Sequence, residues 1–361
     1  MVKLRELAKP FLKVGAFGFG GGVGMLAMLR SECVKKKKWL TDEELSVAVA
    51  IGQMVPGPFV PNYCQYIGYH LGGLKGAMVA TLALLLPSFV LMIMLSYLYI
   101  AFHMLPGIGQ VFKGIGAVMT AIILWASYDM GKVLIKETKA LIIFLLALIL
   151  FLVKFDPVLT VLACGVIRIL LDHVPSKKIL LAVPLFVFDL KKAIELFWVF
   201  FKIGAVIFGG GYAAVPFIRN EVCNYRQWLT AREFLDGVAI GQVTPGPVAI
   251  TATFVGFKVM GLVGAFIATI AIFLPSFLMF IIVIKIYKKI EHNRYVRSFF
   301  GGIKSAIVAI LLSTGIFFVL QNWVNIPYGI FGVICLGILI FTRIEPIFFI
   351  LAGVVFGLIV R

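Results

Sequence analysis

Two segments of the chain carry the same helix-breaking and hydrogen-bonding residues at matching positions. In each segment a triple glycine is followed by a glutamine and then by a Pro-Gly-Pro triplet. Glycine and proline interrupt helices, and an interrupted helix leaves main-chain N–H groups without partners. Such groups bind negatively charged atoms. The first segment contains Gly20, Gly21, Gly22, Gln53, Pro56, Gly57 and Pro58, and the second contains Gly209, Gly210, Gly211, Gln242, Pro245, Gly246 and Pro247.

The Pro-Gly-Pro triplets are the sharper of the two signals. The first proline ends one helix, and the second suits the start of the next, because proline is favoured at the first helical position. The new helix presents free N–H groups and the positive end of its dipole. A simple kink is the alternative, but a kink needs one proline and not the same triplet in both halves. The triplets therefore predict two helix N-termini directed at one anion site.

The triple glycines have a packing alternative, because single glycines let membrane helices approach closely. Three in a row, with Gly15, Gly18 and Gly24 nearby, exceed what packing needs. They can open the backbone and direct several N–H groups at one point, as in an anion nest. The stretch lacks the Gly-Lys-Ser/Thr ending of a nucleotide-binding loop. We therefore expect a small anion and not a nucleotide.

Neutral polar side chains accompany both breaks. Gln53 and Gln242 lie one helical turn before each triplet, where an amide can donate to an oxyanion without burying a charge. The alternative is that each amide satisfies local carbonyl groups freed by the break. Asn62 and Thr251 occupy matching positions after the breaks and are expected to add donors.

Four charged positions also recur. The lysines either extend to the membrane interface or balance a dianion. Each arginine and the acid two residues later either form a mutual salt bridge, make a gate contact or line an anion pathway. The last pair of acids either stabilises helix starts or carries a coupling proton. These residues are Lys13 and Lys202, Arg30 and Arg219, Glu32 and Glu221, and Glu44 and Glu233.

The composition places these residues in a membrane. The chain has 361 residues, of which 62% are hydrophobic, with a mean hydropathy of +1.08; soluble proteins average about 45–50% apolar residues. The net charge of +17 resides in short loops between apolar runs, which argues against nucleic-acid binding. The histidines are scattered without metal-ligand spacing, and no catalytic constellation is present. We expect neither an enzyme, nor a cofactor, nor a metal site.

The repeat divides the chain into a first transporter-like repeat (1–172), a basic linker (173–192) and a second repeat (193–361). We predict an all-α polytopic membrane protein of two inverted repeats. Each half would have five spans and a broken pair whose members are each shorter than the roughly 20 residues of a full span. In the first half, the expected first helix (11–29) contains the triple glycine, the broken pair follows (42–55 with 59–71), and the remaining spans are 76–102, 111–130, 141–153 and 158–171. In the second half, the first helix is 197–218, the broken pair is 231–244 with 248–260, and the remaining spans are 264–286, 300–320, 326–340 and 346–360.

Loop charge supports the inversion. In the first half the lysine-rich loop (35–38) follows the first helix, whereas in the second half it follows the long span (285–297). If the broken pair makes no net crossing, five spans invert the second copy, and both basic loops face the cytoplasm. The exception is the N-terminus, where Lys3, Arg5 and Lys9 would lie outside.

The combined motifs resemble the chromate ion transporter family in its long, two-domain form. They are Phe-Gly-Gly-Gly after a helix start, Trp39-Leu-Thr41, Gly-Gln-x-x-Pro-Gly-Pro and Pro87-Ser-Phe89, and the resemblance extends from residue 11 to residue 360. It implies export of chromate across the bacterial inner membrane, driven by the proton-motive force. The second copy has Tyr212 where the first has Val23. The two copies therefore need not share the work equally.

Two rival functions remain. Sulfate has the shape and charge of chromate, so the same architecture could import sulfate or another oxyanion. An intramembrane enzyme acting on lipid phosphates would need a nucleophile with an acid or base partner, and the sequence shows none. The expected partners are thus a chromate-like or sulfate-like oxyanion, protons and the lipid bilayer, with the chain acting as a monomer or a homodimer.

Overall fold

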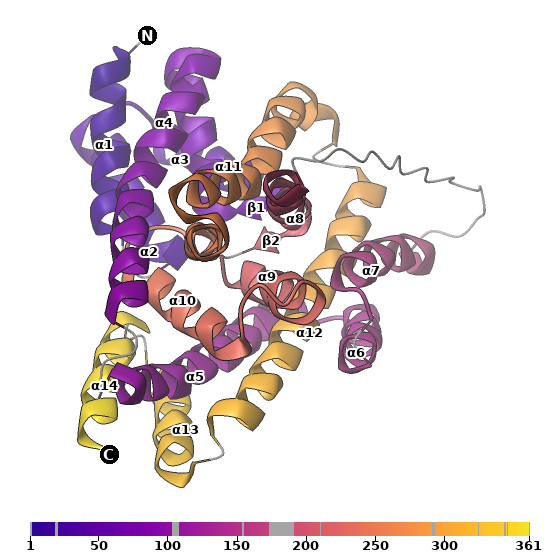
Figure 1. Ribbon diagram of the computed structural model, residues 1–361. Coiled ribbons are helices and arrows are strands. Elements are labelled where there is room, and N and C mark those ends of the chain that lie inside the picture. Colours follow the sequence, from indigo (N-terminus) through magenta and orange to yellow (C-terminus); the bar gives the residue numbers. More distant parts are fainter. Residues whose placement is uncertain are drawn as a thin grey trace.

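A computed structural model describes residues 2–18, 21–102, 108–153, 155–172, 191–209, 211–290, 293–323, 325–342, 344 and 346–360. The described chain is almost entirely helical (Figure 1). The first repeat contains α1 (Leu4–Phe17), α2 (Gly21–Leu29), the π-helical turn η1 (Arg30–Lys36), α3 (Asp42–Met54), the two-residue strand β1 (Gly57–Pro58), α4 (Phe59–Phe102), α5 (Ile108–Leu134), α6 (Thr138–Leu152) and α7 (Pro157–Asp172).

The helices of the second repeat follow the same order, whereas its short strand lies at the glycine stretch and not in the Pro-Gly-Pro triplet. The second repeat contains α8 (Lys191–Val206), β2 (Phe208–Gly209), η2 (Gly211–Ala213), α9 (Ala214–Arg219), η3 (Asn220–Tyr225), α10 (Ala231–Val243), η4 (Val248–Ile250), α11 (Thr251–Ile290), α12 (Arg294–Asn322), α13 (Ile326–Phe341) and α14 (Pro346–Ile359). The sequence prediction of an all-α architecture with two homologous halves is therefore confirmed.

The triple glycines correct one detail of the expected elements. A single first helix that contains the glycines was expected in each half, but α1 ends at Phe17 and α8 ends at Val206. New helical turns begin only at Gly21 and Gly211. The physical reason is that consecutive glycines stabilise a helix least and leave its backbone free to extend. The glycine stretches thus separate two helices in each repeat.

The long helices α4 and α11 each contain a sharp break. The backbone leaves helical geometry at Gly72 and Gly73 in α4, and at Met260 and Gly261 in α11. Gly73 and Gly261 have φ angles of 62° and 60°, which favour glycine. Near each break the two segments touch through glycines, since a Cβ at Gly68 would overlap the Gly76 carbonyl group. The predicted short helices that end before 72 and 261 are therefore present.

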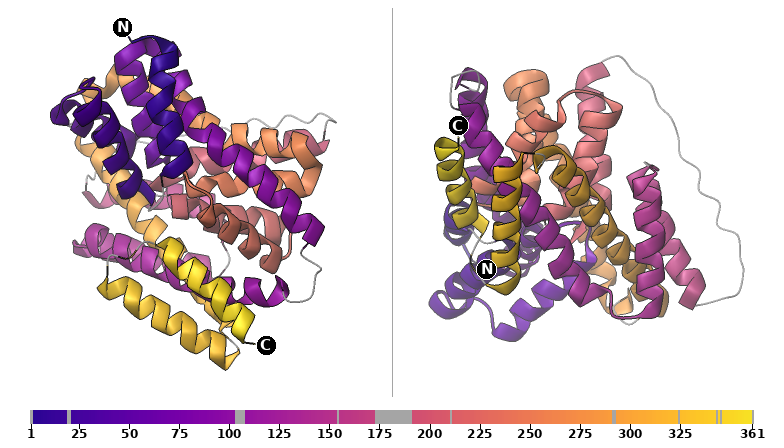
Figure 2. Two further views of the ribbon diagram at one scale, coloured as in Figure 1. Left: turned by 90° about the vertical axis from the view of Figure 1, so that its left-hand side faces the viewer. Right: turned by 90° about the horizontal axis from the view of Figure 1, so that it is seen from below.

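Equivalent helices of the two repeats pack against one another in antiparallel fashion. Asn322, at the end of α12, donates to Thr120 Oγ1 in the first half of α5 (3.1 Å), and Ser127 of α5 donates to the carbonyl of Val308, earlier in α12 (3.1 Å). α5 and α12, which hold equivalent places in the two repeats, therefore run in opposite directions. The views agree that α5 and α12 cross in the lower half of the molecule, with α13 and α14 outside them (Figures 1 and 2).

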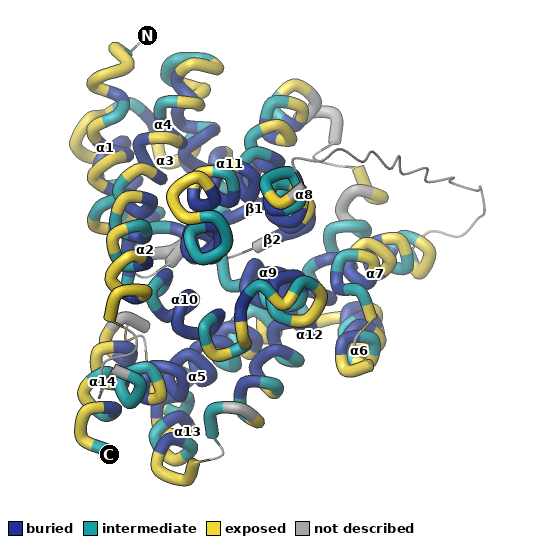
Figure 3. Tube along the Cα trace, viewed as in Figure 1, coloured by how far each residue is buried: buried dark blue, intermediate teal, exposed yellow. Residues whose placement is uncertain are grey.

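The two repeats are also interlocked. The last two helices of each repeat pack on a helix of the other repeat: α6 and α7 contact α12, whereas α13 and α14 contact α5. The buried residues gather around β1, β2, α8 and α10, and exposed residues line the outer helices (Figure 3). On α4 the exposed residues are apolar at helical spacing, namely Leu82, Leu86, Val90 and Met94. Such a face suits lipid contact.

Four helices of the described chain are long and apolar enough to cross a membrane, judged by length and composition. They are Phe59–Phe102, Gly109–Leu134, Val248–Lys285 and Ser298–Leu320. Shorter apolar helices, including α6 and α13, pack beside them. Together with the apolar outer faces, these helices identify a multi-pass membrane protein.

Candidate functional site

The breaks of the two repeats meet at the centre of the molecule. β1, in the first Pro-Gly-Pro triplet, pairs in parallel with β2, which leads into the second glycine stretch (Figure 1). The Gly57 N–H donates to the Ile207 carbonyl (2.5 Å), and the Gly246 N–H donates to the Gly18 carbonyl (3.1 Å). Gly246 is the repeat equivalent of Gly57, and Gly18 is that of Ile207. Each triplet therefore binds the glycine stretch of the other repeat.

The central glycines of the triplets cannot be replaced without strain. Gly57 and Gly246 have φ angles of 106° and 115°, which side chains disfavour. A Cβ at Gly57 would lie 2.6 Å from Ser276 Cβ, and one at Gly246 would overlap Ser88 Oγ. Ser88 Oγ also donates to the Pro245 carbonyl (2.6 Å). The repeated Pro-Ser-Phe motif thus supplies the serine that contacts the opposite triplet.

Each broken pair is a helical hairpin whose open end is held by a salt bridge. Glu44, in the first turn of α3, lies 3.2 Å from His70 Nε2, and Glu233 in α10 lies 2.9 Å from Lys258 Nζ. The same two acids complete capping boxes with Thr41 and Thr230. Glu44 and Glu233 therefore stabilise helix starts, and each hairpin returns to the side on which it began.

In the second repeat two helix starts converge beside an amide without a partner. Gly211, which begins η2, packs against Val248, which begins η4, so closely that a Cβ at Gly211 would lie 2.9 Å from Val248 N. Tyr212 donates to Gln242 Oε1 (3.1 Å). This bond leaves the buried Gln242 Nε2 without a hydrogen-bond partner in the described chain. A buried amide donor next to two helix N-termini is suited to an oxyanion.

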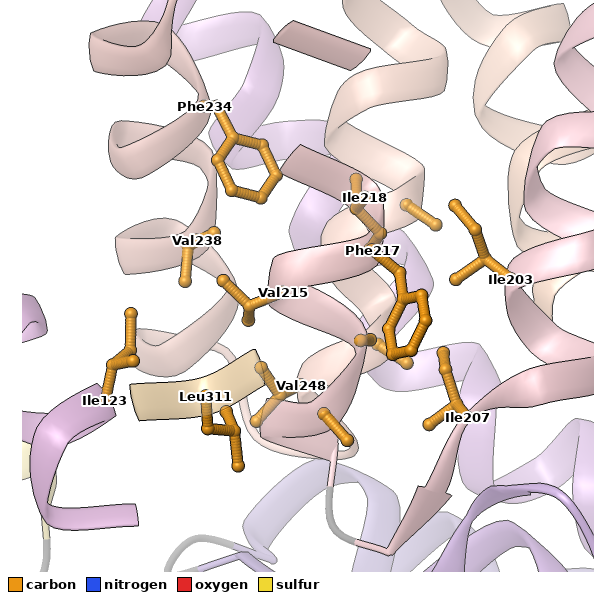
Figure 4. Close-up of a cluster of buried hydrophobic side chains, with 14 of the residues drawn as sticks. Ile123, Ile203, Ile207, Val215, Phe217, Ile218, Phe234, Val238, Val248 and Leu311 are labelled. Atoms are coloured by element: carbon orange, nitrogen blue, oxygen red, sulfur yellow. The ribbon is translucent and has the colours of Figure 1, made fainter. Parts of the chain in front are cut away.

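An apolar cluster fixes the position of these helix starts. Val248 of η4, Val215 and Phe217 of α9, and Val238 of α10 belong to one buried cluster, in which Val215 lies on the side of Val248 and Val238, and Phe217 lies on the side of Ile207 (Figure 4). Ile207, whose carbonyl accepts from Gly57, belongs to the same cluster. Close packing of this kind holds the main-chain groups of the breaks in one arrangement.

The predicted donors after the breaks are mostly engaged with local carbonyl groups. Asn62 Nδ2 lies within hydrogen-bonding distance of the carbonyls of Gly52, Val55 and Pro56, whereas its buried Oδ1 has no partner in the described chain. Thr251 Oγ1 donates to the Val248 carbonyl (2.8 Å). Both side chains therefore stabilise the breaks themselves.

Several predicted residues lie outside the described chain or lack described side chains. Gly20 and Gly210 are among the undescribed residues, and the side chain of Gln53 is not described. Gly21 and Gly22 begin α2, while Gly209 ends β2. Pro56 and Pro247 flank the glycines whose N–H groups bind the opposite repeat. The structure thus brings together the described parts of both triplets and both glycine stretches.

The recurring charges form salt bridges that partly differ from those expected. Lys13 Nζ lies 2.9 Å from Glu32, and Lys202 Nζ lies 3.1 Å from Glu221, with both acids largely buried. The expected mutual pairing of each arginine with the acid two residues later is absent among the described residues. Instead, Arg30 Nε donates to Asp42 (2.7 Å), which is the first residue of α3.

Arg219 has lost the partner that its equivalent keeps. Ala231 stands where the first repeat has Asp42, and Arg219 instead stacks on the Phe317 ring, 3.3 Å from its centroid. Its Nε has no hydrogen-bond partner in the described part of the chain. Ring stacking therefore stands, for Arg219, in place of the ion pair that Arg30 forms with Asp42.

Sequence reasoning missed one buried polar residue on α4. Gln65 is fully buried, and neither its Oε1 nor its Nε2 has a partner among the described residues. It lies one helical turn after Asn62 and one before Tyr69, whose ring contacts Phe280 of α11. The spacing from Asn62 was the available signal, but the second repeat has no glutamine at the equivalent position, where the match of Gly68 with Gly256 places Thr253.

Two polar cavities of about 510 Å³ each lie at opposite ends of the α5–α12 pair. The first is lined by Lys113 from the start of α5 and Asn322 from the end of α12. The second is lined by Leu134 from the end of α5 and Ser298 from the start of α12. The repeat relationship that exchanges α5 and α12 therefore also exchanges the two cavities.

The fold and the paired breaks define a multi-pass membrane transporter built from two repeats. A family model described as "Chromate transporter" matches residues 5–169 and again residues 194–358. A chromate transport protein of Cupriavidus metallidurans is 30% identical, covering 99% of this chain and 93% of that protein. An uncharacterized transporter of Methanocaldococcus jannaschii is 31% identical over 87% of this chain and 84% of that protein.

The chain belongs to the chromate transporter family. A chromate transport protein of Pseudomonas aeruginosa is also 30% identical, covering 86% of this chain and 80% of that protein. No solved structure gives a significant match to the chain.

Proposed function

We propose that this protein carries a tetrahedral oxyanion, chromate first, through a site formed where the broken helices of the two repeats meet. The single observation that supports this most strongly is the reciprocal bonding of Gly57 to Ile207 and of Gly246 to Gly18. These bonds place the interruptions of both repeats side by side. Open backbone at membrane depth is stable only where it is buried in protein or lines a polar cavity.

The chemistry of chromate suits the groups near the breaks. Chromate is a tetrahedral dianion near neutral pH and offers only acceptor oxygens. The binding groups would be the unpaired Nε2 of Gln242, the N–H groups that begin η4 and η2, and their equivalents at the start of α4 and α2. Helix N-termini contribute positive potential without a buried ionised side chain. Gln53 and the glycines at 20–22 would complete the first-repeat side.

Transport by alternating access between inverted repeats is the corresponding mechanism. It is supported by the antiparallel α5 and α12 and by one polar cavity at each end of that pair. In the proposed cycle, one repeat moves against the other and opens the central site to each cavity in turn. The positive loops would face the cytoplasm of a bacterial cell, and the flux would be outward.

Proton coupling completes the proposal. Glu44 and Glu233 remain the candidate coupling acids, but their partners differ. Glu44 contacts His70, whereas Glu233 contacts Lys258. Each acid lies at the open end of its hairpin, where binding of a coupling proton would weaken the contact that closes the hairpin.

The test is chromate and sulfate flux in proteoliposomes under an imposed pH gradient. The proposal expects saturable chromate flux that increases with the pH gradient and that exceeds sulfate flux. If sulfate flux exceeds chromate flux, the assigned substrate would change to sulfate, and the assigned function would change to uptake of a nutrient oxyanion. Absence of flux for both anions, in protein that has inserted and is monodisperse, would contradict oxyanion transport by this chain.

A further inference from the structure

The cavity at the start of α12 combines a polar interior with an excess of positive charge. Four cationic and two acidic side chains line it. Both acids are already neutralised within the cavity wall: Arg168 Nε lies 2.9 Å from Asp172 and Arg168 also pairs with Glu137. Lys139 adds a second cation to Asp172 at 2.8 Å. The carboxylates therefore leave no negative charge for the other cations.

Three lining cations have no carboxylate partner among the described residues. Lys136 and Arg294 are exposed at the mouth of the cavity, and Lys304 is partly buried on the α12 side. A lysine within an apolar membrane helix is costly unless it meets a negative partner or water. Lys304 belongs to the apolar stretch Ser298–Leu320 and has no negative partner among the described residues. Its charge is therefore available to water or to an anion that enters the cavity.

Helix α12 runs from this cavity to the central breaks. α12 packs against β2 and η2, and its Leu311 belongs to the apolar cluster that holds Val248 (Figure 4). Lys304 lies two helical turns before Leu311, which is a rise of about 10 Å along the helix axis at 1.5 Å per residue. The same helix therefore carries Lys304 in the cavity and contacts the segments at which helices of the second repeat begin.

The opposite cavity shows the same design with the lysine displaced by one turn. In α5 the equivalent positions of Gly301 and Lys304 are occupied by Lys113 and Gly116. Each cavity is thus lined by one lysine and one glycine from the same helix, α5 in the first cavity and α12 in the second, and the glycine adds no side chain to the cavity. Because a lysine at either position is unmatched in the other repeat, the comparison of repeats in the sequence did not reveal it.

We infer that the cavity lined by Lys136, Arg294 and Lys304 is a second binding site, which holds a soluble tetrahedral oxyanion on its way to or from the central site. The volume of 510 Å³ greatly exceeds the roughly 30 Å³ of one water molecule, so the anion would keep part of its hydration shell. Lys304 Nζ would form the charge-assisted hydrogen bond at the inner end. Arg294 and Lys136 would attract the anion at the mouth.

This inference deepens the proposed function, and its test separates the two. Binding of radiolabelled chromate, sulfate and phosphate is measured on purified protein without anionic lipid, for wild type and for Lys304→Gln. A lost hydrogen bond to a charged group costs about 1.5–3 kcal/mol, so Lys304→Gln should weaken binding at one site roughly tenfold or more. Lys304→Arg keeps the charge and should restore binding. Lys113→Gln, in the opposite cavity, is the matched control and should leave this site unchanged.

A second variant, at the exposed mouth of the cavity, tests the inference even if Lys304→Gln does not fold. Lys136→Gln should fold normally and slow chromate association, with a smaller effect at high salt because screening weakens attraction between exposed charges. If wild type binds no oxyanion at all, the proposed function fails. If wild type binds and Lys304→Gln binds equally well, only the second site is disproved. If Lys304→Gln retains less phosphatidylglycerol in nanodiscs than wild type but binds oxyanions equally well, the inference is also overturned, because the cavity would then hold a lipid headgroup.

Discussion

The N–H of Gly57 lies 2.5 Å from the carbonyl oxygen of Ile207, and these two residues belong to different repeats. Its counterpart, from Gly246 to Gly18, is 3.1 Å long. The interruption of one repeat is therefore completed by the glycine stretch of the other. Neither repeat of this chain has a complete centre by itself, and movement of one against the other must change these contacts.

Replacement of the triplet glycines should stop transport. Gly57→Ala and Gly246→Ala each force a side chain into a backbone conformation that costs about 1–3 kcal/mol and press a Cβ on Ser276 or Ser88. About 1.4 kcal/mol corresponds to a factor of ten, so flux in proteoliposomes should fall at least roughly tenfold.

Gly73→Ala is the matched control for these substitutions. Gly73 also has a positive φ, but no atom lies within 4 Å of the added Cβ. This variant should lose stability while keeping more flux than the triplet variants. Equal flux in all three variants would mean that contact between the repeats at the triplets is not required.

The unpaired amide of Gln242 gives the second prediction. Gln242→Leu removes the donor, and a hydrogen bond to a charged group contributes about 1.5–3 kcal/mol, so the Kd for chromate should rise roughly 10- to 100-fold. Tyr212→Phe removes only the hydroxyl that orients the amide and should have a smaller effect. Calorimetric titration of both variants checks this order. A larger loss in Tyr212→Phe than in Gln242→Leu would assign the binding role to the tyrosine.

The third prediction concerns the unequal hairpin salt bridges. Glu44 contacts His70 at the open end of the first hairpin, whereas Glu233 contacts Lys258 at the open end of the second. Tyr66 stacks on His70 beside the first contact. His70→Ala removes the partner of Glu44 and should speed hydrogen exchange at the start of α3. The matched change Lys258→Ala should speed exchange at the start of α10. Unaltered exchange in both variants would show that these contacts do not hold the hairpins closed.

The fourth prediction concerns stability and pH at the first helix. Hydrogen bonds from Lys13 and Lys36 hold the pKa of Glu32 below its ordinary value. A lowered pKa contributes stability above the unfolded-state value, and that contribution is lost as the pH falls through the folded-state pKa. Lys13→Met should therefore lower the unfolding temperature at neutral pH and have progressively less effect in acid. A constant difference between wild type and variant across that range would show that charge pairing is not the cause.

Local signals in the sequence predicted the parts of the fold that short segments determine. Glu44 stabilises a helix start, which is one of the two roles expected for it, and the Pro-Gly-Pro triplets end α3 and α10 within a residue of the expected positions. These features depend on neighbours three or four residues apart. Their physical causes are therefore visible in the sequence itself.

Contacts between distant segments could not be read in the same way. The triple glycines interrupt the first helix of each half because the opposite triplet binds the extended backbone there, as Gly246 binds Gly18. Arg30 pairs with Asp42, whereas Glu32 pairs with Lys13. Lys304 and Gln65 escaped notice because neither has a counterpart of its own kind in the other repeat. Residues that break the repeat require the packed structure to reveal them.

The most direct test of the central site is anomalous X-ray diffraction at the chromium absorption edge from crystals soaked in chromate. The account predicts one chromium peak between the starts of η2 and η4, with a chromate oxygen within hydrogen-bonding distance of Gln242 Nε2, and predicts that this peak disappears in Gln242→Leu. Chromium bound only away from both Pro-Gly-Pro triplets, with the Gln242 amide still unpaired, would contradict it.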